Sequence, residues 1–356
     1  MENFDFIVIG AGLFGIYASI DLNKRGYKVL LIDKEQIPYS KASLINQARI
    51  HMGYHYPRSI TTAISSLNFS KRFINEHQEF INQSFTSLYG IDKYGSLTTK
   101  EQFIRFSKFL NLYYEEIEIP NIFNKDRFEA CFKVQEFTFD PFLLREYYLS
   151  KIENSKIKEL FGCNIEKAYK VKDKWHIELN LDNKLKKYIC ASNVVNATYA
   201  SINIINEIFN LEKIDVENQF SEIVLVYCNC LSNYGLTVMD GPFVSIIPYG
   251  NSGLHSLTSV SYTHHNNFTN HKDNKLKKNK PISNSKKMIT QLGNYLSDKE
   301  KIYNHGSLYT IKTKLKKSHI NDSRPTNILK LSENPGFYQL FSGKISSIYE
   351  FEGLWQ

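Results

Sequence analysis

The stretch that decides the fold runs from Phe6 to Asp33 and reads FIVIGAGLFGIYASIDLNKRGYKVLLID. It opens with a short, wholly apolar run, which is typical of a strand buried on both faces of a parallel sheet. A Gly-x-Gly-x-x-Gly pattern follows at residues 10–15, and then a helical segment, a second apolar run and an aspartate. This order predicts a strand, a glycine turn, a helix and a second strand, which together form a dinucleotide-binding unit.

Each glycine of the turn has its own physical reason. Gly10 permits the tight turn, Gly12 lets a pyrophosphate approach the backbone, and Gly15 lets the helix pack closely on the strand. The N-terminus of the helix offers partial positive charge to the phosphates. Asp33 ends the second strand, where its carboxylate can accept hydrogen bonds from both hydroxyls of a ribose. We expect this acceptor to disfavour a 2′-phosphate.

The composition is that of a globular chain, and its length of 356 residues predicts two domains. The net charge of +8 favours anionic ligands. Nucleic acid is not expected as a partner, because the lysines are scattered and no nucleic-acid motif accompanies them. Five cysteines without disulfide or metal spacing indicate reduced thiols, so we expect a cytoplasmic protein with no metal site.

The apolar segment near the start of the sequence, residues 6–20, could in principle be a signal peptide or a membrane span. It is preceded by acidic residues rather than basic ones, and three glycines interrupt it. We therefore expect neither a signal peptide nor a membrane span.

The segment that follows the dinucleotide unit favours FAD over NAD. Residues 40–59 are rich in small and polar side chains and fit poorly as a helix or a simple strand. An NAD enzyme would be expected to start another short strand–helix unit here. A long loop carrying hydrogen-bonding groups suits the extended FAD molecule.

Several motifs together resemble the FAD-dependent oxidoreductases of the D-amino-acid oxidase superfamily, which includes glycine oxidase, sarcosine oxidase and L-2-hydroxyglutarate oxidase. The segment 46–57 is similar to a stretch of the hydroxyglutarate-oxidase branch that passes along the flavin, and His51 and Gly53 match it. Residues 194–198, VVNAT, resemble the strand end beside FAD, although Tyr199 replaces the glycine that usually follows. The resemblance implies FAD as the cofactor and oxidation of a small-molecule substrate.

Three further motifs carry the same resemblance. Phe139-Asp140-Pro141 resembles the start of the helix that precedes the adenine-side strand. Arg324-Pro325 resembles the position of the arginine that binds the substrate carboxylate, which implies an anionic substrate. Residues 341–346 resemble a turn whose helix points at the pyrimidine edge of the flavin. A helix N-terminus there, with Lys344, would stabilise the negative charge of reduced flavin.

The resemblance implies an α/β fold, α+β overall, in which a Rossmann-like FAD-binding domain is interleaved with a substrate domain built on a mostly antiparallel sheet. The FAD-binding domain is expected at residues 1–80, 136–215 and 305–356, and the substrate domain at 81–135 and 216–304. Hydrophobic patterning predicts further elements. These are a strand at 94–98 with a helix at 101–114, a hairpin of 165–171 with 175–179, and strands at 223–230, 243–248, 255–262 and 337–340.

The candidate site residues follow from these motifs. The predicted catalytic or substrate-contacting residues are Arg324, His51, Lys344 and Tyr249. Arg324 would grip an anionic group, because a guanidinium binds carboxylate or phosphate in a bidentate manner. His51 would orient the substrate or act as its base. The predicted FAD contacts are Gly10, Gly12, Leu13, Phe14, Gly15, Asp33, Lys34, Ser43, Asn46, Gln47, Ala48, Ile165, Ala197, Thr198, Gly343, Lys344 and Ile345.

Alternative functions stay open at this point. The same glycine motif also resembles UDP-galactopyranose mutase, a flavin enzyme without net redox chemistry, although Arg324-Pro325 counts against it. A non-catalytic protein with an FAD fold is the third possibility. The lysine-rich segment 265–287 is either a solvated loop, or a lid or basic rim that attracts an anionic substrate or carrier.

Overall fold

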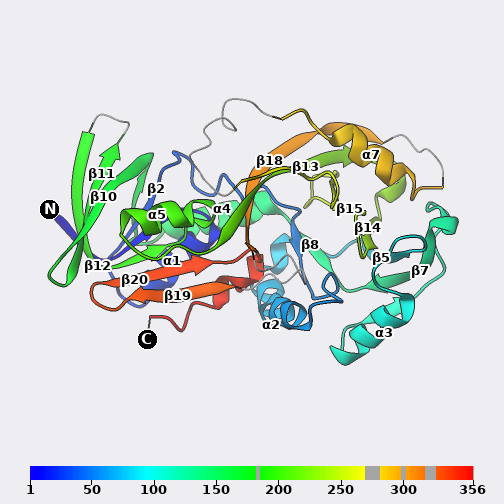
Figure 1. The fold of residues 1–356 in the computed structure, drawn as a ribbon, viewed down its shortest axis with the longest axis horizontal. Coiled ribbons are helices and arrows are strands. Elements are labelled where there is room, and N and C mark those ends of the chain that lie inside the picture. Colours follow the sequence, from blue (N-terminus) through cyan, green and yellow to red (C-terminus); the bar gives the residue numbers. More distant parts are fainter. Residues whose placement is uncertain (182–184, 269–280, 298–301, 317–325, 356) are drawn as a thin grey trace.

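The computed structural model describes residues 1–181, 185–268, 281–297, 302–316 and 326–355, without the side chains of residues 266–268. It contains two large sheets and one small one (Figure 1). The first sheet contains β1 (Glu2–Ile9), β2 (Val29–Asp33), β9 (Lys158–Phe161), β10 (Cys163–Val171), β11 (Lys174–Leu181), β12 (Leu185–Asn196), β19 (Asn327–Ser332) and β20 (Gly336–Phe341). The small sheet contains β3 (Arg49–Ile50), β8 (Phe137–Phe139) and β4 (Ile81–Asn82).

The second large sheet is mostly antiparallel, and among the strand pairs of the described residues only β5–β14 is parallel. Its strands are β5 (Thr86–Asp92), β6 (Tyr114–Glu116), β7 (Phe128–Val134), β13 (Val216–Tyr227), β14 (Tyr234–Met239), β15 (Val244–Pro248), β16 (His255–Ser259), β17 (His264–Phe268) and β18 (Tyr303–Leu315).

The described α-helices span from 7 to 17 residues and connect strands along the chain. The α-helices are α1 (Leu13–Lys24), α2 (Ile60–Glu76), α3 (Lys100–Phe109), α4 (Pro141–Glu153), α5 (Ile202–Ile208) and α7 (Ser285–Gly293). The 3-10 turns are η1 (Gln78–Phe80), η2 (Lys125–Arg127), η3 (Tyr199–Ser201), η4 (Asn229–Leu231) and η6 (Ile345–Tyr349). Within the described ranges, none of these helices has the length and apolar character of a membrane-crossing segment.

The centre of the first sheet is the parallel series β20-β12-β1-β2-β9. Both of its faces are buried, as the apolar run at residues 6–9 predicts. Phe6 and Val8 of β1 point into one core cluster, while Ile7 and Ile9 point into another on the opposite face. The α/β class and the predicted dinucleotide unit are therefore confirmed.

The first half of β12 pairs with β11 and its second half with β20. The antiparallel strands β10 and β11 thus extend the parallel sheet at one end of the molecule (Figure 1), and they form the hairpin expected at residues 165–179. Asp140 caps α4, as its motif predicts, because its Oδ1 accepts hydrogen bonds from the backbone N–H groups of Phe142 and Leu143 at 3.0 and 3.1 Å.

The strand predicted at residues 94–98 is wrong, because the strand of this region is β5 and it ends at Asp92. Asp92 Oδ1 accepts hydrogen bonds from the backbone N–H groups of Tyr94 and Gly95, both at 2.9 Å, and this Asx turn stops the strand. The following helix does form. It begins at Lys100 because Thr99 and Gln102 make a capping box.

The turn after β20 also differs from its expectation. Residues 345–349 form the 3-10 turn η6 instead of an α-helix, and Lys344 precedes it in an extended conformation. A second difference concerns β18, which pairs with β13 over its whole length. Residues 305–315 therefore lie in the second sheet, although they were expected in the FAD-binding domain; the division into two domains itself remains a prediction.

Candidate functional site

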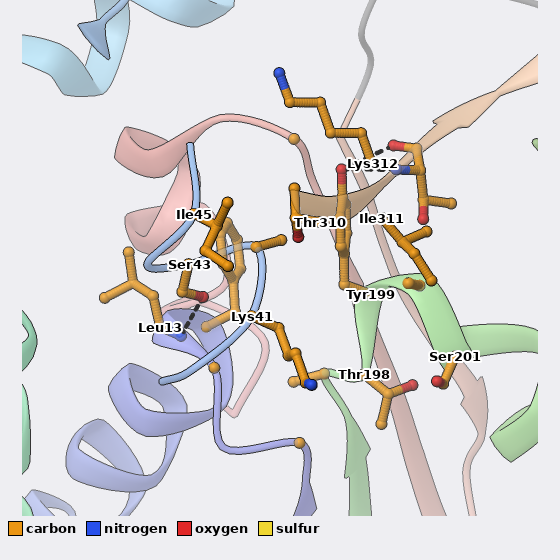
Figure 2. Close-up of a pocket in the computed structure, with 18 of the residues that line it drawn as sticks. Leu13, Lys41, Ser43, Ile45, Thr198, Tyr199, Ser201, Thr310, Ile311 and Lys312 are labelled. Carbon is orange, nitrogen blue, oxygen red and sulfur yellow. Dashed lines mark hydrogen bonds between the residues drawn. The ribbon is translucent and has the colours of Figure 1, made fainter. Parts of the chain in front are cut away.

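One cavity of about 800 Å³ lies between the two large sheets. Its walls come from segments far apart in the sequence: the glycine turn after β1, the end of β2 with the loop that follows, the turn after β12, strand β18 and the turn after β20 (Figure 2). Cavities of this size accommodate small molecules and cofactors. The cavity is therefore the candidate functional site.

The glycine turn has the geometry that its motif predicts. Gly10 has φ +104°, and a Cβ there would lie 2.7 Å from the carbonyl oxygen of Ala197. A Cβ on Gly15 would lie 1.8 Å from the carbonyl oxygen of Gly10, so only glycine lets α1 approach β1 this closely. Gly12 is the N-cap of α1 and supplies no side-chain cap, so the helix N-terminus opens onto the cavity. This cradle fits a pyrophosphate.

The side chains of Asp33 and Ser43 accept hydrogen bonds from the backbone of the glycine turn. Asp33 Oδ2 accepts a hydrogen bond from the backbone N–H of Ala11 at 2.6 Å, and Asp33 Oδ1 accepts one from Glu35 at 2.9 Å. Burial raises the pKa of the Asp33 carboxyl above its ordinary value, although these backbone N–H groups oppose the shift. Ser43 Oγ accepts from the backbone N–H of Leu13 at 2.9 Å (Figure 2). Both side chains line the cavity.

The polar loop at 40–51 is shaped by its own side chains. Asn46 Nδ2 donates to the carbonyl of Ser43 at 2.8 Å, and its Oδ1 accepts from the backbone N–H of Ala48 at 2.7 Å. Ala48 has φ +57°, a conformation that this local hydrogen bond supports. Gln47 Nε2 donates to Thr258 Oγ1 of β16, which ties the loop to the second sheet.

The structure brings most of the predicted site residues to this cavity. The lining residues among them are Gly10, Gly12, Leu13, Phe14, Asp33, Lys34, Ser43, Asn46, Gln47, His51, Ile165, Ala197, Thr198, Gly343, Lys344 and Ile345. Gly15, Ala48 and Tyr249 are not among the described residues that line it. Tyr249 is buried, and its hydroxyl donates to the carbonyl of Leu44 at 3.4 Å. Arg324 lies outside the described residues, as does most of the basic segment 265–287.

Lys344 is buried, with only 4% of its surface exposed. Its Nζ donates to the carbonyl of Thr62 at 3.0 Å and to Ser65 Oγ at 3.3 Å, both in α2, and lies 5.7 Å from the centre of the Tyr56 ring. Because η6 has only five residues, the helix dipole expected beside Lys344 does not form. Any support for a negative charge here therefore comes from the Lys344 ammonium rather than from a helix.

Two buried charged residues beside His51 were missed from the sequence. The Arg49 guanidinium lines the cavity, and its side chain is 2% exposed. Its Nη2 donates to Thr237 Oγ1 at 2.7 Å and to Ser245 Oγ, and its Nη1 lies 3.5 Å from Glu136 Oε2. A lone arginine in a polar loop carries no local signal for burial. Its partner is 87 residues away in the sequence.

Glu136 joins this arginine to His51. Its Oε2 accepts from the Tyr89 hydroxyl at 2.6 Å, and its Oε1 accepts from the backbone N–H of Met52 at 3.2 Å and lies 3.9 Å from His51 Nδ1. Burial raises the pKa of the Glu136 carboxyl, while the Arg49 charge and these hydrogen bonds oppose the shift. A histidine with one ring nitrogen facing a carboxylate is suited to proton transfer through the other.

The cavity lining is electropositive in the part of the chain that the structure describes. Its basic residues are Lys34, Lys41, Arg49, Lys312, Lys314 and Lys344, and its acidic residues are Asp33 and Glu35. Strand β18 supplies a whole wall, residues 309–315, which the sequence did not identify. An excess of positive charge favours negatively charged ligands.

Comparison with known proteins places this geometry in context. The family model DAO, described as FAD dependent oxidoreductase, matches residues 5–292. A 90-residue segment is 30% identical to the FAD-dependent monooxygenase FPY4 of Fusarium mangiferae. That match spans 25% of this chain and 24% of the length of that curated relative.

Solved structures match over almost the whole chain. L-alpha-glycerophosphate oxidase from Mycoplasma pneumoniae, with FAD bound, has 15% identity and a TM-score of 0.78 over 100% of this chain and 96% of that one. Glycine oxidase from Geobacillus kaustophilus has 12% identity and a TM-score of 0.74 over 98% and 91%. L-proline dehydrogenase from P. horikoshii has 15% identity and a TM-score of 0.73 over 98% and 90%. These similarities concern the fold.

Proposed function

The chain belongs to the DAO family of FAD-dependent oxidoreductases, and from that premise we propose that it oxidises a C–H bond next to an amine or hydroxyl group of a small anionic substrate. Its cofactor is FAD, and it is an oxidase or a dehydrogenase. One observation carries the proposal. One cavity is lined both by the glycine turn and by His51 and Arg49.

The residues present fit FAD. The pyrophosphate would lie against the N-terminus of α1, where Gly12 leaves the backbone accessible, and a ribose would meet the Asp33 carboxylate. The loop at residues 43–51 and the turn at 343–345 would hold the remaining part of the FAD molecule. When bound, FAD supplies the acceptor for a hydride from the substrate carbon.

His51 is the proposed base. The amine or hydroxyl must lose a proton when its carbon loses the hydride, and the imidazole takes that proton. Glu136, 3.9 Å from Nδ1, favours the tautomer that carries hydrogen on Nδ1 and leaves Nε2 as the acceptor. The buried carboxylate also offsets the positive charge that His51 gains.

The excess of basic residues in the described lining supports an anionic substrate. Two of these basic residues form ion pairs with carboxylates of the protein. Lys41 Nζ lies 3.2 Å from Glu35 Oε2, and Lys314 Nζ lies 3.5 Å from Glu217 Oε2. Lys344 donates to neutral oxygen atoms of α2, whereas the Arg49 guanidinium contacts two hydroxyl oxygens and lies 3.5 Å from the Glu136 carboxylate. The proposed substrates are therefore amino acids, 2-hydroxy acids or small phosphate esters.

The family assignment favours net oxidation over the mutase and non-catalytic alternatives. The test is to mix the purified FAD-loaded protein with candidate compounds under anaerobic conditions and to record the flavin absorbance. We expect an amino acid, a 2-hydroxy acid or glycerol 3-phosphate to bleach the flavin, and ethanolamine and glycerol, which lack an anionic group, to leave it oxidised. Equal bleaching by compounds with and without an anionic group would contradict the anionic preference. Turnover that needs prior reduction by dithionite would indicate a mutase instead.

A further inference from the structure

Tyr199 stands where the family-like motif after β12 has a glycine, and it adopts a backbone conformation that suits glycine. Its φ is +48°, in the left-handed region that bulky residues rarely occupy. Such strain persists only where the surroundings fix the residue in place. The contacts of the Tyr199 side chain must therefore hold its backbone in this strained conformation.

The hydroxyl of Tyr199 binds the backbone of one residue in β18 twice. It accepts a hydrogen bond from Thr313 N and donates one to Thr313 O, both at 3.0 Å. The N–H and C=O of one residue in an antiparallel strand point to the same side. Tyr199 thus occupies the place that a neighbouring strand would take on this side of β18. Its ring also stacks on Phe341 at a centroid distance of 5.6 Å.

This tyrosine connects the two walls of the cavity. Tyr199 follows β12 of the parallel sheet, whereas Thr313 belongs to the long strand that pairs with β13 of the antiparallel sheet. Figure 2 shows the Tyr199 side chain reaching from its turn beside Thr198 toward β18, where its hydroxyl end lies near Lys312. The two hydrogen bonds therefore join the two walls at this point.

We propose that Tyr199 is a positioning residue that latches β18 to the parallel sheet and thereby retains FAD in the cavity. The inference rests on the proposed placement of FAD against the glycine turn. Release of a cofactor held between two walls requires the walls to separate, and the latch must break for that to happen. A glycine at position 199 would adopt this backbone conformation without strain. It would have no side chain with which to bond β18.

The test compares Tyr199→Phe with the FAD-loaded wild-type protein. This variant keeps the stacked ring and removes both hydrogen bonds. The matched control is Tyr295→Phe, which removes a tyrosine hydroxyl bonded to Asp92 Oδ2 at 3.0 Å in the second sheet, outside the described cavity lining. FAD release is followed by the rise in flavin fluorescence after dilution. We expect Tyr199→Phe to release FAD about tenfold faster, as the loss of two hydrogen bonds implies, and the control to match the wild type.

A second variant separates the latch from a purely structural role. Tyr199→Gly restores the motif residue and relieves the backbone strain at φ +48°, but it also removes the ring that stacks on Phe341, so we expect FAD release at least as fast as in Tyr199→Phe. An apoprotein destabilised by both variants with an unchanged release rate would overturn the latch. Gly12→Val reports on the placement of FAD. If Gly12→Val retains FAD as wild type does, the placement fails; if it loses FAD while Tyr199→Phe releases FAD at the wild-type rate, only the latch fails.

Discussion

His51 Nδ1 lies 3.9 Å from Glu136 Oε1, and the other oxygen of the same carboxylate lies 3.5 Å from Arg49 Nη1. The buried Glu136 carboxylate therefore lies close to both the candidate base His51 and the buried cation Arg49. Arg49 reaches on to Thr237 of β14, so the position of His51 is coupled to the second sheet through this carboxylate and this guanidinium. The coupling explains how a loop residue can keep a fixed orientation at the cavity.

Glu136→Gln should change the pH dependence of flavin reduction. Loss of the negative charge makes protonated His51 less stable, so its base form persists to lower pH. We expect the acidic limb of the rate profile to move to lower pH by about one unit, with a lower rate at the plateau. Stopped-flow flavin reduction between pH 5 and 9 measures this effect. The control is Glu146→Gln, at an exposed site beside Arg145; a profile identical to wild type in Glu136→Gln would refute the role of the pair.

Arg49→Met should destabilise the fold. Removal of the guanidinium leaves Glu136 as a buried charge without its partner, and such losses cost about 3–5 kcal/mol. We expect chemical denaturation to report a fall of this size in the free energy of unfolding. The double variant Arg49→Met/Glu136→Leu should recover much of it, because both charges are then absent. A double variant as unstable as the sum of the two single variants would show that the residues act independently.

His51→Gln should retain FAD and lose catalysis. A positioned general base contributes about 10²–10⁴-fold to the rate, so we expect a fall of that order in the rate of flavin reduction at saturating substrate. The visible flavin spectrum of the variant checks that the cofactor is still bound. His55→Gln is the control, because the His55 ring lies 5.7 Å from that of His51 and is not among the described lining residues. Equal losses in both variants would indicate damage to the loop rather than loss of a base.

His77 should make the protein less stable in mild acid. Its Nδ1 lies 2.8 Å from the carbonyl of Phe73 and its Nε2 lies 2.9 Å from the Tyr148 hydroxyl, and burial lowers its pKa below the ordinary 6.5. The unfolded chain therefore binds the proton more tightly than the folded protein does. The contribution of His77 to stability is complete above pH 6.5 and is lost as the pH falls through the lower folded-state value.

Thermal unfolding at pH 7.5 and at pH 5.5 measures this effect. We expect the drop in unfolding temperature between the two pH values to be smaller in His77→Gln than in wild type. His305→Gln, at an exposed position in β18, should keep the wild-type drop. The same drop in all three proteins would show that other groups govern the acid sensitivity.

The dinucleotide unit could be predicted from the sequence because each of its positions has a local reason. The glycines, the buried strands and Asp33 all act within one short stretch, and the structure places them as expected. The error at residues 94–98 arose because hydrophobic patterning alone suggested a strand, whereas the Asp92 side chain folds the backbone into a turn. That competition depends on one hydrogen-bonding group rather than on periodicity.

The missed parts of the site depend on contacts between distant segments. The pairing of Arg49 with Glu136 and the β18 wall become visible only when the two sheets come together. The loop around His51 was identified by resemblance, and its catalytic role remains a prediction. Tyr199 was noticed as a departure from a motif, but its partner Thr313 lies 114 residues further along the chain. Local patterns carry no information about such pairs.

The order in which the cavity walls occur in the sequence has a consequence for biosynthesis. Its lining begins at Ile9 and is complete only at Ile345, because β20 pairs in parallel with β12 and the turn after it closes the site. Contacts between such distant segments form slowly, and a growing chain folds from its beginning. A partly synthesised chain on the ribosome thus contains the glycine turn but lacks part of the cavity lining. A complete lining for the flavin therefore requires residues 336–345 to be in place.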